Sequence, residues 1–203
     1  MKKSFSLFLA LLVIAGRLEA SALVTTWDES VNGDLSSDPA APTAVVFSTD
    51  TNRVTGTVRN ADDVRDYWTF TIAPGQLLTA VILDNYQDVN SGDAGNRGFH
   101  SINAGPTSFI PGTDPNDSFL GGDHLDATSI GTNLLLDLES GGLAGTGFTI
   151  PLGPGTYSYL VQQTGPEHTA YTLDFVVIPE PTPAILFTAA GGLLVLRRTR
   201  KTS

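Results

Sequence analysis

Apolar and polar residues alternate along much of the chain between Leu23 and Ile178, which indicates strands that bury one face. The side chains expected to point into a core are Trp68, Phe70, Ile72, Tyr157, Tyr159, Val161, Tyr171, Leu173, Phe175 and Val177. Leu77–Leu83 is more continuously apolar, so it is predicted to be a central strand. Helical capping signals are absent from the span, and Leu134–Glu139 is too short to count as a predicted helix.

Two turn signals agree with this strand pattern. Ala73-Pro74-Gly75-Gln76 and Gly153-Pro154-Gly155-Thr156 each place proline second and glycine third, which favours a type II turn. Both follow a Phe-Thr-Ile run. The sequence therefore predicts an all-β protein with a single antiparallel β-sandwich of jelly-roll type over residues 23–178.

The first 22 residues have the order of features found in a secretory signal peptide. Lys2 and Lys3 precede an apolar run over residues 5–15. Ala20 and Ala22 supply the small residues that a signal cleavage site requires. Residues 1–22 are therefore predicted to be removed by the export machinery, with Leu23 as the new N-terminus.

The last 25 residues have a different but equally ordered pattern. Pro179-Glu180-Pro181 precedes an uncharged apolar helix predicted over residues 184–196, and a basic end follows at 197–201. Thirteen helical residues span only ~20 Å, which is short of a hydrocarbon core of ~30 Å. The basic end, which includes Arg197 and Arg198, is expected on the cytoplasmic side of the membrane. The segment is thus predicted to be a short transmembrane helix.

This combination of Pro-Glu-Pro triplet, short apolar helix and terminal arginines resembles a PEP-CTERM sorting tail. The resemblance covers residues 179–203. It implies a Gram-negative-type bacterium and processing by an exosortase-type enzyme, with Pro179, Glu180, Pro181, Arg197 and Arg198 as the recognition residues. It also implies transient residence in the inner membrane through the tail, then a cell-surface or extracellular location, with exopolysaccharide as a partner.

A second resemblance covers most of the domain. Asp28–Ser36, Gly56–Val58, Asp63–Phe70 and Pro74-Gly75 are similar to an exported bacterial β-domain that occurs on PEP-CTERM proteins and is distantly similar to pre-peptidase C-terminal domains. The resemblance implies a β-sandwich with no established activity.

The charge of the domain excludes one class of partner. Between Leu23 and Ile178 the chain has four arginines, no lysine and 19 acidic residues, a formal charge of −15. Such a surface repels phosphate backbones, so no nucleic-acid partner is expected. The chain also has no cysteine, which excludes disulfides and thiolate chemistry.

Acidic, glycine-rich segments at 84–98 and 111–132 are weak calcium candidates, because Ca²⁺ prefers oxygen ligands on irregular backbone. The residues proposed as ligands are Asp114, Asn116, Asp117 and Asp123. Their spacing lacks the order of an EF-hand loop, so a solvated acidic loop is the alternative. Asp62, Asp63 and Asp66 precede a strand, where Asp66 is expected to cap the turn. No other cofactor is expected.

No catalytic motif was found, so the protein is predicted not to be an enzyme. The three histidines, at 100, 124 and 168, lack the spacing of a zinc site. Glu139 and Glu167 leave a glycoside hydrolase as a remote alternative. A carbohydrate-binding module is the nearer alternative, and it would need exposed aromatic side chains. The candidates for that platform are Trp27, Trp68, Tyr86, Tyr157 and Tyr159.

Overall fold

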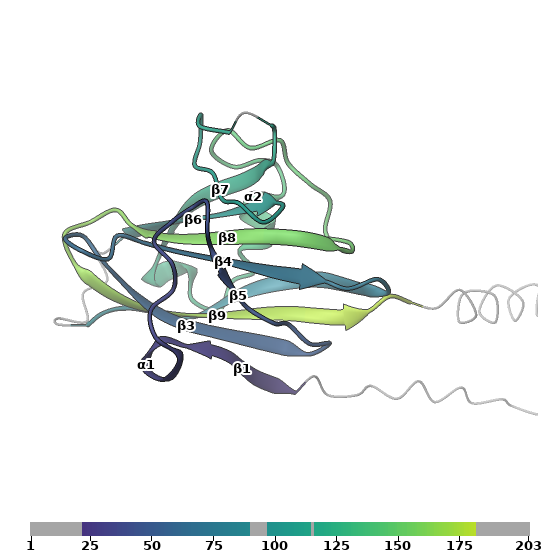
Figure 1. Cartoon of the computed structure of the whole chain (residues 1–203), viewed down its shortest axis with the longest axis horizontal. Helices are drawn as coiled ribbons and strands as arrows, with labels where there is room; N and C mark the ends of the chain where they lie inside the picture. The colour runs from purple at the N-terminus through teal and green to yellow at the C-terminus, as the bar shows by residue number, and fades with distance from the viewer. Residues whose placement is uncertain (1–21, 90–96, 115, 182–203) are drawn as a thin grey trace, which may run out of the picture.

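The computed structural model describes residues 22–89, 97–114 and 116–181. Strands dominate these residues (Figure 1). In chain order the elements are β1 (Leu23–Asp28), α1 (Glu29–Asn32), β2 (Thr43–Ala44), β3 (Thr51–Arg59), β4 (Arg65–Ile72), β5 (Gln76–Asp88), β6 (Arg97–Ala104), β7 (Phe119–Asp126), the 3₁₀ turn η1 (Ala127–Ser129), α2 (Leu135–Leu138), β8 (Gly155–Gln163) and β9 (His168–Pro179). The predicted all-β class is confirmed.

The strands form two sheets. Sheet A has the order β1-β3-β9-β5, and sheet B has the order β2-β4-β8-β6-β7. Both are mixed rather than purely antiparallel, because β1 pairs with β3 and β2 pairs with β4 in parallel. The parallel pairs sit at one edge of each sheet, as the strand orders show. The prediction of a wholly antiparallel sandwich was therefore wrong at these edges.

One apolar core joins the two sheets, and aromatic rings form its centre. Trp68 and Tyr159 of sheet B lie with ring centroids 5.1 Å apart. Phe175 of sheet A meets them edge-on, at 6.1 Å from Trp68 and 5.2 Å from Tyr159. All three rings are fully buried. The alternating residues predicted to face the core on β4, β8 and β9 are all buried, which confirms the assigned strand faces.

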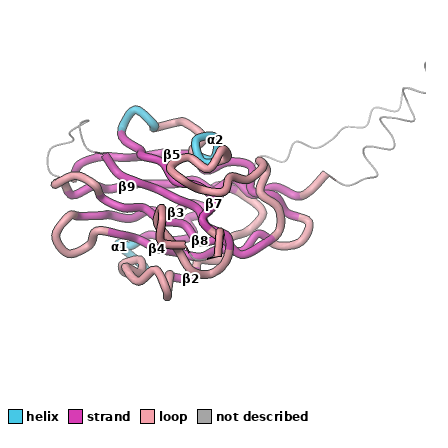
Figure 2. Tube along the Cα trace, turned by 90° about the horizontal axis from the view of Figure 1, so that it is seen from above, coloured by secondary structure: helices cyan, strands magenta, loops and turns pink. Residues whose placement is uncertain are grey.

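The position of the strand over Leu77–Leu83 differs from the prediction. This segment belongs to β5, which is the last strand of sheet A and pairs only with β9 in the sheet. Leu78, Val81 and Leu83 are nevertheless buried in the main core. The segment around α2 lies along the outer edge of β5 (Figure 2). Leu134 N donates to Val81 O at 2.8 Å there. Residues 135–138 form one helical turn, so Leu134–Glu139, which was considered too short for a helix, is helical over that turn.

The two predicted type II turns behave differently. Gly75 has φ = +80°, and Gln76 N donates to Ala73 O at 3.0 Å, which agrees with the first prediction. The second turn is not formed: Gly155 lacks a positive φ and is already the first residue of β8, opposite Ile72. Pairing across sheet B has overridden the local turn signal at this position.

The outer face of sheet B is covered by a loop over residues 105–118. Tyr67, Phe99, Phe119 and Leu160 form a small second apolar cluster there, and Ile110 packs against it. Tyr67 alternates with Trp68 along β4 and so faces away from the main core, yet it is only 2% exposed. The loop therefore buries this part of the outer face of sheet B, which forms a second apolar layer.

Both predicted processing regions begin at the edges of this fold. β1 starts at Leu23, the predicted mature N-terminus. Pro179 ends β9 opposite Gln76, and Glu180 N donates to Gly75 O at 2.8 Å, so the sheet extends into the Pro-Glu-Pro triplet. Ala20 and the tail beyond residue 181 lie outside the described residues. Within the described ranges no helix has the length and apolarity needed to span a membrane.

Candidate functional site

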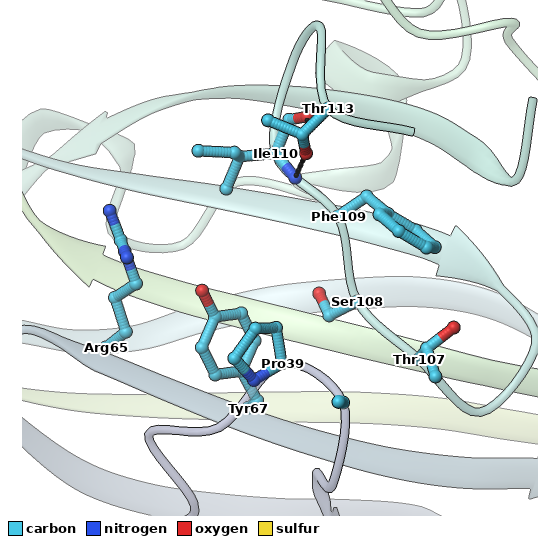
Figure 3. A pocket seen from close by; sticks show the side chains of 9 residues that line it. Pro39, Arg65, Tyr67, Thr107, Ser108, Phe109, Ile110 and Thr113 are labelled. Atoms are coloured by element: carbon cyan, nitrogen blue, oxygen red, sulfur yellow. Dashed lines mark hydrogen bonds between the residues drawn. The ribbon is translucent and has the colours of Figure 1, made fainter. Parts of the chain in front are cut away.

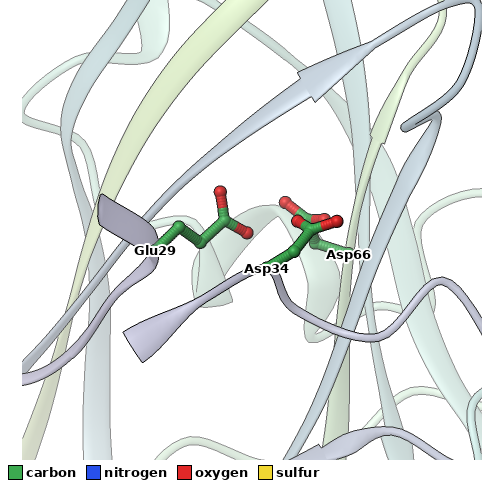
Figure 4. A group of neighbouring side chains, drawn as sticks. All are labelled: Glu29, Asp34 and Asp66. Carbon is green, nitrogen blue, oxygen red and sulfur yellow. The ribbon is translucent and has the colours of Figure 1, made fainter. Parts of the chain in front are cut away.

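Three carboxylates converge where the N-terminal segment meets the start of β4. One carboxylate oxygen each of Glu29, Asp34 and Asp66 lies within 4.8 Å of the other two (Figure 4). The local structure of the N-terminal segment brings Glu29 and Asp34 close together. Asp28 caps the single turn α1 through Ser30 N, and Gly33 at φ = +88° then reverses the chain. A left-handed conformation of this kind favours glycine, so Gly33 fits the reversal.

Glu29 is fixed in place by backbone donors. Leu35 N donates to its Oε1 at 3.1 Å, and Thr57 N donates to its Oε2 at 2.7 Å. These bonds tie the N-terminal segment to β3. Gly56 makes room for this arrangement, because a Cβ there would lie 3.0 Å from the Glu29 Cδ and 2.5 Å from the Tyr171 hydroxyl.

Asp66 lies deeper than the other two carboxylates and is fully buried. Tyr171 OH donates to its Oδ2 at 2.7 Å. Its Oδ1 is buried without a hydrogen-bond partner among the described residues, and the same holds for Asp63 Oδ1 nearby. Asp66 was expected to cap a turn. That expectation was wrong, because Asp66 has the same strand parity as Trp68 and points inward.

The cluster has no compensating cation among the described residues, so its buried carboxyl groups favour the protonated form. Burial, and next the neighbouring Glu29 carboxylate, raise the pKa of Asp66 to about 10. Burial likewise raises the pKa of Glu29 to about 7, although the hydrogen bonds from its two backbone donors lower it. Burial also raises the pKa of Asp63 to about 6. Within the described ranges none of Glu29, Asp34 and Asp66 forms an ion pair, and Arg59 is paired with Asp62 at 2.7 Å.

A groove of about 740 Å³ opens beside the cluster, and Glu29, Asp34 and Asp63 contribute to its walls. Asp66 does not line it. The donor set consists of oxygen atoms only, which is the chemistry that Ca²⁺ prefers and Zn²⁺ does not. Glu29, Asp34 and Asp66 are therefore the residues that would hold a hard cation, with Asp63 beside them.

The four predicted calcium ligands do not gather in this way. Asp114 is used by its own loop, where it accepts from Asn116 N, Ser118 Oγ and Phe119 N. Asp123 accepts from His124 N on β7. Asp117 shares a small hollow with Asp114. Of the residues that the structure describes, only Glu29, Asp34 and Asp66 form an acidic or histidine group with metal-binding spacing.

The other candidates are also dispersed. His100 is fully buried and bonded to the Tyr159 hydroxyl at 2.8 Å through Nδ1. His124 and His168 join no metal-binding group within the described ranges, and neither do Glu139 and Glu167.

Of the five aromatic residues considered for a sugar platform, four are buried and Trp27 is half-buried. Trp68, Tyr86, Tyr157 and Tyr159 are buried in the main core. Trp27 packs against that core and donates from Nε1 to Gly33 O at 3.2 Å. These residues therefore do not form the exposed platform that a carbohydrate-binding module of that design would need.

The acidic cluster was not predicted from the sequence, although one signal for it is present there. Asp66 continues the inward parity of Trp68 and Phe70, so a charged residue stood in a core position. Its partners could not be found in the same way, because Glu29 and Asp34 belong to a separate segment.

Comparison with known proteins gives little further guidance. No protein-family profile matches the chain, and no curated protein matches it significantly. A crystal structure of Salmonella Typhimurium PliG, a periplasmic lysozyme inhibitor of g-type lysozyme, is similar at 18% identity. The match covers 66% of this chain and 97% of PliG, with a TM-score of 0.32. At this TM-score the similarity assigns no function to the chain.

Proposed function

We propose that this protein is an exported, non-enzymatic β-sandwich protein that binds a calcium ion through Glu29, Asp34 and Asp66. One observation carries the proposal. Asp66 Oδ1 is buried and unpartnered among the described residues, and its carboxyl group belongs to a cluster of three that no described cation pairs with. Without a cation the raised pKa of about 10 keeps the Asp66 carboxyl protonated, and a bound divalent cation would replace that proton and stabilise the ionised form.

The geometry argues against using the same carboxylates for catalysis. Asp66 is fully buried and does not line the groove, so a substrate in the groove would not reach it. Both oxygens of Glu29 already accept backbone hydrogen bonds. A general acid or base must reach the proton that it transfers. The cluster therefore supports a structural cation rather than a glycoside hydrolase.

The location of the protein is part of the same proposal. The sorting tail would deliver the domain through an exosortase-type enzyme to the cell surface or matrix, with exopolysaccharide as its neighbour. Calcium is abundant outside cells, and extracellular modules bind it with dissociation constants of roughly 0.1–1 mM. In this proposal the cation joins the N-terminal segment to β4, so that the domain gains stability after export.

The test is the thermal stability of the protein with calcium and with a chelator. A few millimolar calcium should stabilise the folded state by roughly 1 kcal/mol at near-millimolar affinity. Asp34→Asn should remove most of that gain. Asp34 is exposed and makes no side-chain hydrogen bond to a described residue, so the substitution should leave the fold intact.

Asp117→Asn is the matched control, because it removes one carboxylate from the loop that the sequence favoured. Asp117 has φ = +54°, a conformation that asparagine also tolerates. A calcium response that survives Asp34→Asn but is lost in Asp117→Asn would refute the cluster as the site. Equal melting temperatures with calcium and chelator would refute calcium binding altogether.

A further inference from the structure

Two hollows lie side by side on the outer face of sheet B, under the loop that covers it. One has a volume of about 400 Å³ and the other about 280 Å³. Arg65 and Ile110 line both hollows, so the two are adjacent and share these side chains; together they are called the trough. Figure 3 shows Arg65 and Tyr67 projecting from β4 toward the segment that carries Ile110 and Thr113.

The trough is separate from the acidic cluster, although the two are adjacent in sequence. Side chains alternate along a strand, so Arg65 points outward while Asp66 points into the core. The trough wall is mainly apolar and is formed by Pro39, Tyr67, Phe109 and Ile110. Phe99 and Leu143 continue it in the second hollow.

Arg65 is a charged residue in this wall, and no described carboxylate pairs with its guanidinium. Its Nε donates to Gln162 Oε1 at 2.9 Å. Burial raises the pKa of the Tyr67 hydroxyl, and the adjacent Arg65 guanidinium opposes that rise. Among the described residues Arg53, Arg59 and Arg97 each lie within 4.0 Å of a carboxylate, whereas Arg65 does not. Its guanidinium can therefore accept an anion from outside.

Two hydroxyl groups of the first hollow, those of Thr113 and Ser108, are already engaged. Thr113 Oγ1 donates to Ile110 O at 2.9 Å and accepts from Ile110 N at 3.2 Å. Ser108 is buried, and its Oγ accepts from Asn103 Nδ2 at 3.3 Å. A neutral sugar needs several free polar partners, and Thr113 and Ser108 contribute little to such a set. The wall matches a ligand with an apolar body and one anionic group.

We propose that this trough binds a small monocarboxylate with an aliphatic or aromatic body. The carboxylate would lie on the Arg65 guanidinium, whose fork matches two carboxylate oxygens. The apolar body would cover Tyr67, Ile110 and Phe109 and displace water from them. A volume of about 400 Å³ is within the range of small-molecule sites.

Isothermal titration of the full chain with octanoate, 1-octanol and octylammonium tests the proposal. Octanoate should bind saturably with one-to-one stoichiometry, and 1-octanol should bind at least tenfold more weakly. Octylammonium should bind more weakly than octanoate, although the domain is strongly negative. If octylammonium or 1-octanol binds as tightly as octanoate, the proposed role of Arg65 is wrong.

Two arginine substitutions locate the site. Arg65→Gln should weaken octanoate binding roughly ten- to a hundredfold, the usual range for a charge-assisted hydrogen bond. Arg97→Gln removes the same charge from an exposed position outside the trough and should leave the affinity unchanged. Equal affinity in wild type and Arg65→Gln, or no octanoate binding at all, would overturn the proposal. Binding of an oligogalacturonate in the trough without any binding of octanoate would also overturn the proposal, because the ligand would then be an acidic sugar.

Discussion

Single residues determine whether the acidic cluster can form, and at Gly56 there is no space for a side chain. It lies on the inner face of β3, where Tyr171 and Glu29 approach the backbone closely. Both neighbours are fixed by hydrogen bonds, to Asp66 and to Thr57 N. A methyl group at this position must therefore displace a bonded side chain rather than a mobile one.

Gly56→Ala should destabilise the protein by about 1–3 kcal/mol, the usual cost of overpacking a core. It should also reduce the calcium response, because Glu29 would move away from Asp66. Urea unfolding with and without calcium measures both effects. Gly153→Ala is the control, since a Cβ there meets nothing within 4 Å. A Gly56→Ala protein with wild-type stability would contradict the crowding argument.

His100 gives a prediction for acid conditions. Burial, and then the nearby His124, lower the pKa of His100 to about 3 from 6.5, so it is neutral in the folded protein. The unfolded chain binds the proton near pH 6.5, so stability falls as the pH drops from about 6.5 toward 3. The Tyr159 hydroxyl faces its Nδ1, and Asp123 lies opposite on β7.

Comparison of wild type with His100→Gln isolates this contribution from the carboxylates. The variant should lose stability less steeply between pH 6.5 and pH 3, by on the order of a few kcal/mol over that range. Urea midpoints across the pH range provide the measurement. Parallel curves for the two proteins would show that His100 is not the responsible group.

At the scale of elements, the covered edge of β5 is the feature that makes a long apolar end strand tolerable. Open edges with apolar residues invite pairing between molecules. Asn133 occupies this edge: its Oδ1 accepts from Val81 N at 3.1 Å, and its Nδ2 donates to Thr79 O at 3.4 Å. It thus supplies partners to backbone groups that would otherwise have none from the sheet.

Asn133→Ala should therefore cost about 1–3 kcal/mol and increase aggregation on partial unfolding. Urea unfolding and light scattering after mild heating would measure the two effects. Asn60→Ala, at an exposed turn position, should change neither. Wild-type behaviour of the Asn133 variant would mean that α2 and its neighbours cover the edge without this side chain.

At the scale of the whole molecule, the proposed sorting tail continues directly from the sheet. Pro179 is the last residue of β9, and the triplet ends at residue 181. We expect an exosortase-type enzyme to remove the residues after the triplet. The apolar segment is shorter than the hydrocarbon core, so a permanent anchor would carry a hydrophobic mismatch. Intact mass spectrometry of protein from the native host tests this. A species that still ends at Ser203 would instead indicate a simple tail anchor.

The sequence by itself determined which side of β4, β8 and β9 faces the main core. The inward faces of β4, β8 and β9 follow from period-two alternation, because strand geometry is local and places every second side chain on one face. The turn at Gly75 was equally predictable, since proline and glycine limit the backbone locally. These features need no knowledge of distant contacts.

Tertiary structure alone decided the strand neighbours and both candidate sites. Glu29 and Asp34 reach Asp66 through the pairing of β1 with β3 and the packing of the two sheets, which no local pattern encodes. Tyr67 is buried because the loop at 105–118 folds over sheet B, and the Arg65 trough exists for the same reason. Alternation specifies only the face on which a side chain lies. What covers that face depends on segments far away in the chain.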